Sequence, residues 1–329
     1  MSGPLILTRR DVQELLGMDD CIVAVEEAFR LHAQGHSLAP GVLGVPAPEG
    51  GFHIKAAGLR LKRLYFAAKT NANFSGNPRR HGLPAIQGVI VLFDADNGCP
   101  LAVMDSMEVT ARRTAAATAV AAKWLARADA STVTICGCGS QGRQQLRALT
   151  RVLPVRRAYA FDLEEAKARA FARELSADLG LEITPTRDHV GMVRRSDVCV
   201  TCTPSRTPFL LRDHVAPGTF VAAVGADSSE KHELDPRLMA EATVVVDVLD
   251  QCAAIGDLHH ALEAGALTRE SVHAELADVV VGRRPGRRSE REITVFDSTG
   301  TALEDVAAAA LVYEKARTAG RGLTVELGN

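Results

Sequence analysis

A short apolar segment followed at once by closely spaced glycines is the feature that most restricts the fold of this 329-residue chain. Residues 132–136 form the apolar segment, and glycines follow it with G-x-G-x-x-G spacing before a helical pattern that continues to Pro154. Such glycines let a strand turn tightly into a helix, whose unpaired N–H groups attract phosphate. The segment therefore predicts a dinucleotide pyrophosphate site made by Gly137, Gly139, Ser140, Gln141 and Gly142.

An acidic residue stands at the distance that a dinucleotide site requires. Asp162 ends the apolar run 158–161, 20 residues after Gly142. A carboxylate there accepts hydrogen bonds from the adenosine ribose and repels a 2′-phosphate, which favours NAD over NADP. The alternative is that Asp162 caps the following helix, with Glu165 completing a capping box.

Strand-like and helical segments alternate from Ser131 onward. Such alternation predicts a parallel sheet and an α/β fold of the Rossmann dinucleotide-binding type. The six predicted strands are 132–136, 157–161, 181–185, 197–203, 219–224 and 243–247.

The first part of the chain has a different pattern. Two helices are predicted within residues 8–35, the first capped by Thr8, and the stretch 38–51, rich in Pro and Gly, is interpreted as a loop. Asn97-Gly98 predicts a hairpin turn. The remaining predicted elements are strands at 52–56, 64–71 and 87–93, a long helix at 108–127 and a last helix at 303–320.

The charge balance argues against polyanionic partners. With 38 basic and 40 acidic residues the net charge is −2, which gives no electrostatic reason to bind nucleic acid or an anionic membrane. Four arginines between 283 and 288 are interpreted as a solvated loop, offset by Glu290 and Glu292. No apolar stretch has the length of a signal peptide core or a membrane helix, so we expect a cytoplasmic protein.

Cysteine and histidine spacings resemble metal motifs at three places. Cys136-x-Cys138 and Cys199-x-x-Cys202 lie in strand-like runs without neighbouring ligands, so they are interpreted as buried, reduced thiols. His259-His260 is interpreted as a solvated helix face. The sequence therefore predicts no metal site.

Several short motifs, taken in order along the chain, carry a recognisable pattern. Together with the glycine loop, their order and spacing resemble the ornithine cyclodeaminase/mu-crystallin family over nearly the whole chain. The motifs are Ala68-Lys69-Thr70-Asn71, Thr110-Ala111-Arg112-Arg113-Thr114-Ala115-Ala116, Gly225-Ala226-Asp227, Glu233-Leu234-Asp235-Pro236, Ser298-Thr299-Gly300 and Glu304-Asp305-Val306-Ala307.

The resemblance implies a homodimer of two-domain chains. Residues 1–125 and 303–329 are expected to form a discontinuous α+β domain for substrate binding and dimerisation. Residues 126–302 are expected to form the Rossmann NAD-binding domain.

Three charged residues match the family's substrate site. Lys69 lies on an apolar strand, where a charge is costly unless it is paired or used; the resemblance implies that it binds the substrate carboxylate and assists proton transfer. Arg113 matches the family's carboxylate-binding arginine, whereas Arg112 points about 100° away on a helix, toward solvent or an interface. Asp227 follows the strand 220–224, and the resemblance implies a general acid and base at the substrate nitrogen.

Four further residues are expected near the cofactor. Thr201 and Thr203 end a strand at the edge where α/β sheets bind ligands, although a strand-ending turn explains them almost as well. Ser298 and Gly300 line the cofactor pocket by resemblance, and Gly300 also suits a simple turn.

The sequence departs from the cyclodeaminase pattern around residues 42–85. Val42 stands where cyclodeaminases have a carboxylate-binding arginine, His53 where they have a glutamate that holds the distal amine of ornithine, and Ala85 where a threonine is expected. Lys55 is a candidate replacement for the missing arginine, from proximity in sequence alone.

These observations favour an NAD-dependent oxidoreductase that acts on the α C–N bond of a small amino or imino acid. Asp227, together with the missing ornithine-specific residues, favours an amino-acid dehydrogenase or cyclic imine reductase. Two alternatives stay open. One is a cyclodeaminase that uses NAD catalytically and releases ammonia, and the other is a non-catalytic dinucleotide-binding protein.

Overall fold

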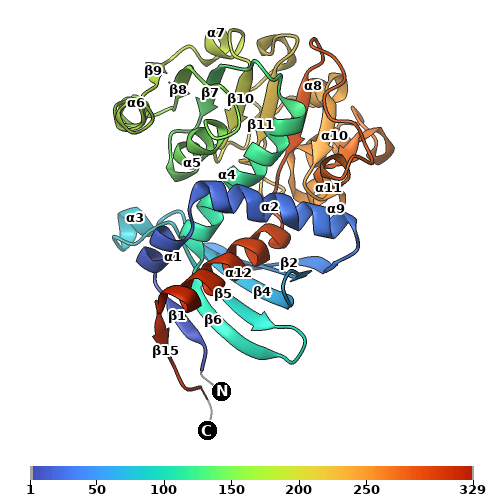
Figure 1. The fold of residues 1–329 in the computed structure, drawn as a ribbon. Helices are drawn as coiled ribbons and strands as arrows, with labels where there is room; N and C mark the ends of the chain where they lie inside the picture. The colour runs from blue at the N-terminus through green and yellow to red at the C-terminus, as the bar shows by residue number, and fades with distance from the viewer. Residues whose placement is uncertain (1–2, 328–329) are drawn as a thin grey trace. The chain divides into compact units, whose positions relative to one another are not determined.

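The computed structural model describes residues 3–327 and contains two compact units. Unit 1 combines the chain up to Arg113 with the chain from Thr301 onward, and unit 2 runs from Thr114 to Gly300. The division falls inside helix α4 (Ser106–Leu125), whereas the sequence places the domain limit at the end of this helix. Each unit has its own sheet (Figure 1).

Unit 1 is built on a seven-stranded sheet with the order β15-β1-β6-β5-β4-β3-β2. Neighbouring strands are antiparallel except for the parallel pair β1 and β6. The strands are β1 (Leu5–Leu7), β2 (Ser37–Ala47), β3 (Gly50–Arg60), β4 (Leu64–Asn73), β5 (Ile86–Asp94), β6 (Cys99–Asp105) and β15 (Leu323–Thr324). The predicted hairpin is confirmed between β5 and β6, where Gly98 has a φ of 77°.

The expected loop at 38–51 is wrong, because most of it is the edge strand β2. Prolines and glycines hid the strand, yet an edge strand tolerates them. The register of β2 against β3 shifts between Leu38 and Gly41, and Pro40 lies within this irregularity. Most side chains of β2 are exposed, so the strand also lacks the alternation of buried and exposed residues that would have identified it.

Helix α12 (Ala302–Ala319) contacts both the helix α2 (Met18–Ala33) and strands β3 to β5, as the red and blue segments of Figure 1 show. Thr301 caps it in a capping box with Glu304, and Gly320 ends it in the left-handed conformation. With a sheet on one side and a helix on another, nearly every residue of its first half is buried. The other helices of this unit are α1 (Arg9–Leu15), capped by Thr8 as predicted, and α3 (Asn77–Arg80).

Unit 2 has a parallel sheet of eight strands with the order β13-β12-β14-β11-β10-β7-β8-β9. The α/β class is therefore confirmed. The strands are β7 (Thr132–Cys136), β8 (Arg157–Phe161), β9 (Glu182–Thr186), β10 (Val198–Thr201), β11 (Phe220–Ala223), β12 (Thr243–Val246), β13 (Ala274–Glu275) and β14 (Thr294–Asp297). The sequence missed β13, which has only two residues, and β14, which lies between β11 and β12.

The helices that accompany this sheet bury apolar faces at helical spacing. In α6, Ala168, Phe171, Ala172 and Leu175 are buried, and Gly180 ends the helix with a φ of 65°. The helices of unit 2 after α4 are α5 (Ser140–Leu149), α6 (Glu165–Leu179), α7 (His189–Val193), α8 (Pro236–Glu241), α9 (Leu249–Ile255), α10 (Asp257–Glu263) and α11 (Leu276–Val280).

The interpretation of the arginine loop is only partly right. Arg283, Arg284 and Arg288 are exposed, but the Arg287 guanidinium is half-buried and donates to the Leu125 carbonyl and to Thr294 Oγ1. Arg287 thus connects the loop of residues 283–288 to α4 and β14 through hydrogen bonds.

All seven cysteines are free thiols. Burial raises the pKa of Cys138 to about 12, which disfavours the thiolate that a metal would need. Within residues 3–327, neither cysteine pair belongs to a group of side chains close enough to hold a metal. None of the helices in this described range has both the length and the apolar character needed to cross a bilayer.

Candidate active site: a glycine loop and a buried charge cluster

The three glycines of the loop after β7 differ in what a side chain would meet. A Cβ at Gly137, whose φ is 107°, would lie 2.7 Å from the Cys202 carbonyl oxygen, and one at Gly142 would lie 2.1 Å from the Gly137 carbonyl oxygen. These two glycines are therefore needed for packing. Gly139 has open space within 4 Å of its Cβ position. Open space at the N-cap of α5 is what the close approach of a pyrophosphate requires.

The start of helix α5 also carries a buried polar atom of interest for ligand binding. Ser140 and Gln141 are the first residues of α5. The Gln141 side-chain nitrogen is buried without a hydrogen-bond partner among the described residues. A ligand group at this helix terminus would remove the cost of that orphaned donor. These features fit a dinucleotide.

Asp162 contacts the glycine loop rather than capping a helix. One carboxylate oxygen accepts from the Cys138 N–H at 2.9 Å, and the other accepts from the Glu164 N–H at 2.9 Å. Helix α6 begins after Glu164 without any side-chain cap, so the alternative capping box with Glu165 is wrong. Asp162 stands at the carboxyl end of β8, next to β7 in the sheet.

The other expected cofactor residues of unit 2 surround buried carboxylates. Thr203 donates from its backbone N–H (2.7 Å) and its hydroxyl (2.6 Å) to Glu233, and Thr201 is the buried last residue of β10. The Gly300 N–H (2.7 Å) and the Ser298 hydroxyl (3.3 Å) donate to Asp247. The structure thus brings these residues to two acids that the sequence analysis did not select.

Four buried acids lie near the carboxyl ends of the strands in unit 2. Glu233 and Asp257 are joined through the backbone, because Asp257 accepts from the Glu233 and Leu234 N–H groups at 2.8 and 2.9 Å. Burial, followed by the charge of Asp257, raises the pKa of Glu233 to about 7. Burial likewise raises the pKa of Asp257 to about 6. The set consists of Glu233, Asp247, Asp257 and Asp297.

In unit 1, Lys69 and Arg113 meet at one buried carboxylate. Lys69 Nζ lies 2.7 and 2.9 Å from the two oxygens of Asp305, and Arg113 Nε donates to Asp305 at 2.9 Å. Arg113 also donates to Glu304 at 2.8 Å. The side chains of Lys69 and Asp305 are only 3% and 1% exposed. Strand β4, helix α4 and helix α12 therefore converge on one charge cluster.

Lys55 adds a third cation to this cluster. It stands directly opposite Lys69 in the register of β3 and β4, and it is buried. Directly opposite residues of an antiparallel pair share a face. Three basic side chains then stand close to the carboxylates of Asp305 and Glu304. Buried basic side chains of this kind suit a small anionic group such as a carboxylate.

The cluster changes the proton affinity of its members. Burial and the charge of Arg113, opposed by Asp305, lower the pKa of Lys69 to about 7. Burial alone would raise the pKa of Asp305, but the charges of Arg113 and Lys69 outweigh it and lower that pKa. Lys69 is therefore poised to exchange a proton near neutral pH, while Asp305 stays ionised.

Arg112 and Asp227 each form an ion pair. Arg112 is not at a free surface, since it pairs with Glu108 at 2.8 Å and donates to the Gln13 and Leu16 carbonyls at the end of α1. Asp227 is 51% exposed and pairs with Lys231. It follows β11 at the carboxyl edge of the sheet in unit 2, as the sequence predicts.

A search with protein-family models finds one that covers residues 3–320, that of the ornithine cyclodeaminase/mu-crystallin family. The chain belongs to this family. It is 40% identical to the alanine dehydrogenase of Archaeoglobus fulgidus over 314 residues, 95% of each chain.

Two solved structures of this family are similar throughout. An archaeal alanine dehydrogenase dimer with bound NAD has a TM-score of 0.94 and 38% identity, covering 99% of both chains. The Δ1-pyrroline-2-carboxylate reductase of Thermococcus litoralis, in complex with NADH and L-proline, has a TM-score of 0.94 and 33% identity, covering 98% of this chain and 100% of the other.

The strand register places Val42 beside the lysines of the charge cluster. Val42 pairs with Lys55, which pairs with Lys69, so Val42 and the two lysines form one row across three strands. The cation at 55 is therefore a direct neighbour of Val42 in the sheet. His53 pairs with Asn71. Because it lies two residues before Lys55 on β3, its side chain points to the same face of the sheet as that of Lys55.

Sequence reasoning missed the acids that organise both regions. Asp305 and Glu304 were part of a recognised motif but received no role. A signal was present, because two adjacent acids interrupt an otherwise apolar, alanine-rich helix. Glu233 was also within a recognised motif, and its burial follows only from the packing of the segment after β11.

Proposed function

We propose that this protein is an NAD-dependent oxidoreductase acting at the α C–N bond of a small amino or imino acid. The observation that carries the proposal is the buried cluster in which Lys55, Lys69 and Arg113 lie around the carboxylates of Glu304 and Asp305. The enzymes similar to it are an alanine dehydrogenase and a reductase of a cyclic imino acid.

The residues of unit 1 would bind the substrate through its carboxylate. Arg113 and Lys55 supply positive charge, and Arg113 is held in place by Glu304 and Asp305. Lys69, with its pKa near 7, would hold or release the proton at the substrate nitrogen side as the C–N bond changes order. Asp227 is the second proposed acid and base for that nitrogen, a role compatible with its solvent access.

The residues of unit 2 would bind the dinucleotide. Gly137, Gly139 and Gly142 shape the loop, and Asp162 would accept from the ribose hydroxyls. The nicotinamide supplies the hydride acceptor in the oxidative direction and the hydride donor in the reductive one. A negative Asp162 disfavours the 2′-phosphate of NADP.

The direct test is a paired assay on the purified protein. NAD with a panel of L-amino acids, and NADH with either pyruvate and ammonia or pyrroline-2-carboxylate, are followed at the NADH absorbance band alongside ammonia release. A stoichiometric absorbance change supports the proposal. Ammonia released from ornithine or lysine without net NADH change would instead establish a cyclodeaminase, and binding of NAD without any turnover would indicate a non-catalytic protein.

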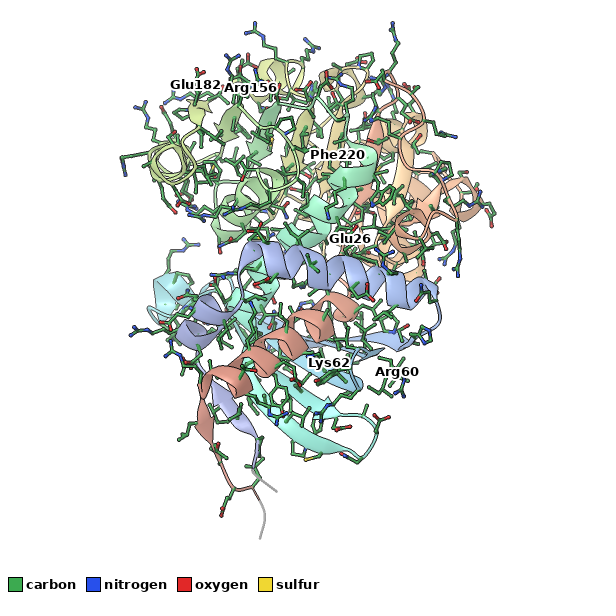
Figure 2. All side chains as sticks on the ribbon, viewed as in Figure 1. Glu26, Arg60, Lys62, Arg156, Glu182 and Phe220 are labelled. Atoms are coloured by element: carbon green, nitrogen blue, oxygen red, sulfur yellow. The ribbon has the colours of Figure 1, made fainter. Side chains whose placement is uncertain are left out.

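A pair of lysine variants makes the test specific for the cluster. We expect Lys69→Met to lower kcat/KM by roughly 100-fold or more, the range typical of lost acid–base catalysis. Lys62→Met is the matched control, because Lys62 is exposed in the turn between β3 and β4 (Figure 2). Equal activity of the two variants would remove Lys69 from the mechanism.

We also propose that the protein forms a homodimer through the edge strand β2. Leu38, Val42, Leu43 and Val45 are all more than two-fifths exposed on this strand, an unusual apolar surface for a free sheet edge. We expect Leu43→Glu to shift the molar mass measured by light scattering from dimer to monomer. Leu163→Glu, at a leucine that is 94% exposed in unit 2, is the control that should stay dimeric.

We also propose a cytoplasmic location, which the free thiols support.

A further inference from the structure

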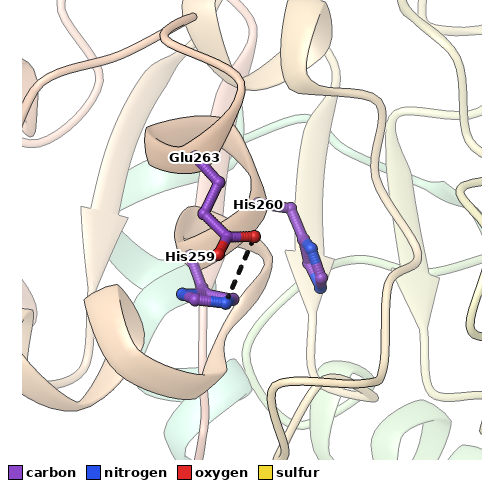
Figure 3. A group of neighbouring side chains, drawn as sticks. All are labelled: His259, His260 and Glu263. Atoms are coloured by element: carbon purple, nitrogen blue, oxygen red, sulfur yellow. Dashed lines mark ion pairs between the residues drawn. The ribbon is translucent and has the colours of Figure 1, made fainter.

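Helix α10 carries a group of side chains that the proposed reaction does not use. His259, His260 and Glu263 each offer one ligand atom, and the three atoms lie within 4.8 Å of one another (Figure 3). The interpretation of the histidines as a solvated face is wrong, since both rings are half-buried and bonded to the backbone. Glu263 is exposed.

The backbone contacts determine which ring nitrogen is protonated. His259 Nδ1 lies 3.2 Å from the Ala253 carbonyl oxygen, and His260 Nε2 lies 2.9 Å from the Lys231 carbonyl oxygen. A carbonyl oxygen only accepts, so each of these nitrogens must donate its proton. In the neutral rings, His259 Nε2 and His260 Nδ1 are then the atoms with a lone pair. A metal-binding histidine has this same arrangement, with its second N–H held by a carbonyl.

The spacing of the ligand atoms suits a small tetrahedral ion. His259 Nε2 and a Glu263 oxygen are 3.5 Å apart. Bonds of about 2.0–2.2 Å to Zn²⁺ place neighbouring ligand atoms roughly 3.4 Å apart. This pair therefore already has the required separation. The His260 ligand atom lies within 4.8 Å of the other two, so an approach of at most roughly 1.4 Å gives it the tetrahedral separation.

Ring packing links the site to residues 231–234. The His260 ring stacks on the His232 ring with centroids 3.9 Å apart and an angle of 12°. His232 also contacts the Leu234 carbonyl, so the stack connects α10 with residues 231–234.

We propose that His259, His260 and Glu263 form a binding site for a Zn²⁺ ion, with water as the fourth ligand. Two imidazoles and one carboxylate are a ligand set that Zn²⁺ accepts, whereas Mg²⁺ and Ca²⁺ prefer oxygen ligands alone. The bound ion holds the His260 ring against Lys231 and His232. It therefore clamps α10 to the segment 231–234.

The experiment is a Zn²⁺ titration of the full chain in competition with a chromophoric chelator, repeated for His259→Ala and Glu263→Gln. We expect one ion per chain, and an affinity at least ~10-fold weaker in each variant. His81→Ala, which removes an exposed histidine of unit 1, is the control and should bind as the unchanged protein does. Glu263 is exposed, so its variant folds even if the histidine variant does not.

A Co²⁺ spectrum and hydrogen exchange separate the remaining outcomes. Nitrogen and oxygen ligation gives visible bands without the near-ultraviolet charge-transfer band of thiolates, and that band would assign the ion to cysteine and overturn the proposal. Absence of binding, or binding in both variants as tight as in the unchanged protein, would overturn the proposal and leave only the contact between His259 and Glu263. Slower amide exchange at residues 231–234 on Zn²⁺ binding supports the clamp, and unchanged exchange overturns that part.

Discussion

Gly139→Ala should weaken NAD binding without lowering the stability of the unliganded protein. The Gly139 backbone has φ −77° and ψ −162°, which alanine adopts without strain, and its Cβ position is open. We therefore expect the variant without ligand to be as stable as the parent, or more stable by ~0.4–1 kcal/mol because its unfolded chain is less flexible. The added methyl group would occupy the space that the pyrophosphate needs.

The size of the effect follows from ligand linkage. NAD at 100 times its Kd stabilises the folded protein by about 2.7 kcal/mol. For a unit of this size that corresponds to a rise of roughly 5–10 °C in Tm. A tenfold loss of affinity removes about 1.4 kcal/mol of this stabilisation. In thermal unfolding followed by circular dichroism, the NAD-dependent rise should therefore fall to about half or less.

Gly142→Ala provides the opposite control, because its Cβ would lie 2.1 Å from the Gly137 carbonyl oxygen. This variant should unfold at a lower temperature even without NAD. A full NAD-dependent rise in Gly139→Ala would refute the assignment of this loop to the pyrophosphate. A large loss of stability in unliganded Gly139→Ala would refute the geometry from which the expectation derives.

Three further changes test the charged residues. Asp305→Asn should lower the free energy of unfolding by ~3–5 kcal/mol, because Lys69 and Arg113 lose their buried counter-charge; an unchanged urea midpoint would contradict this. The pKa of Lys69 falls from 10.5 to about 7 on folding, so the unfolded chain binds more protons between these values and stability should rise with pH across that window. Lys69→Met should lack this rise in urea titrations at several pH values. Asp162→Ser should reduce the NAD preference, measured as the ratio of kcat/KM for NAD and NADP, and an unchanged ratio would exclude its ribose role.

The sequence by itself determined the elements whose physical requirements are local. Gly142 is needed because a side chain would collide with the backbone of Gly137, five residues earlier in the same loop. The capping box of Thr8 and the turn at Gly98 depend on three or four neighbouring residues. Alternating strands and helices after Ser131 indicated a parallel sheet, because each segment carries its own hydrophobic period.

Only the tertiary structure decided where the charges meet. Lys69 and Asp305 are 236 residues apart in sequence, and only the packing of α12 against β4 brings them to 2.7 Å. The pairing of Lys55 with Lys69 depended on β2 to β4 being strands in a particular register, which the prolines and glycines of β2 concealed. The proton affinity of Lys69 depends on burial and on partners from distant segments, and no local pattern in the sequence encodes those.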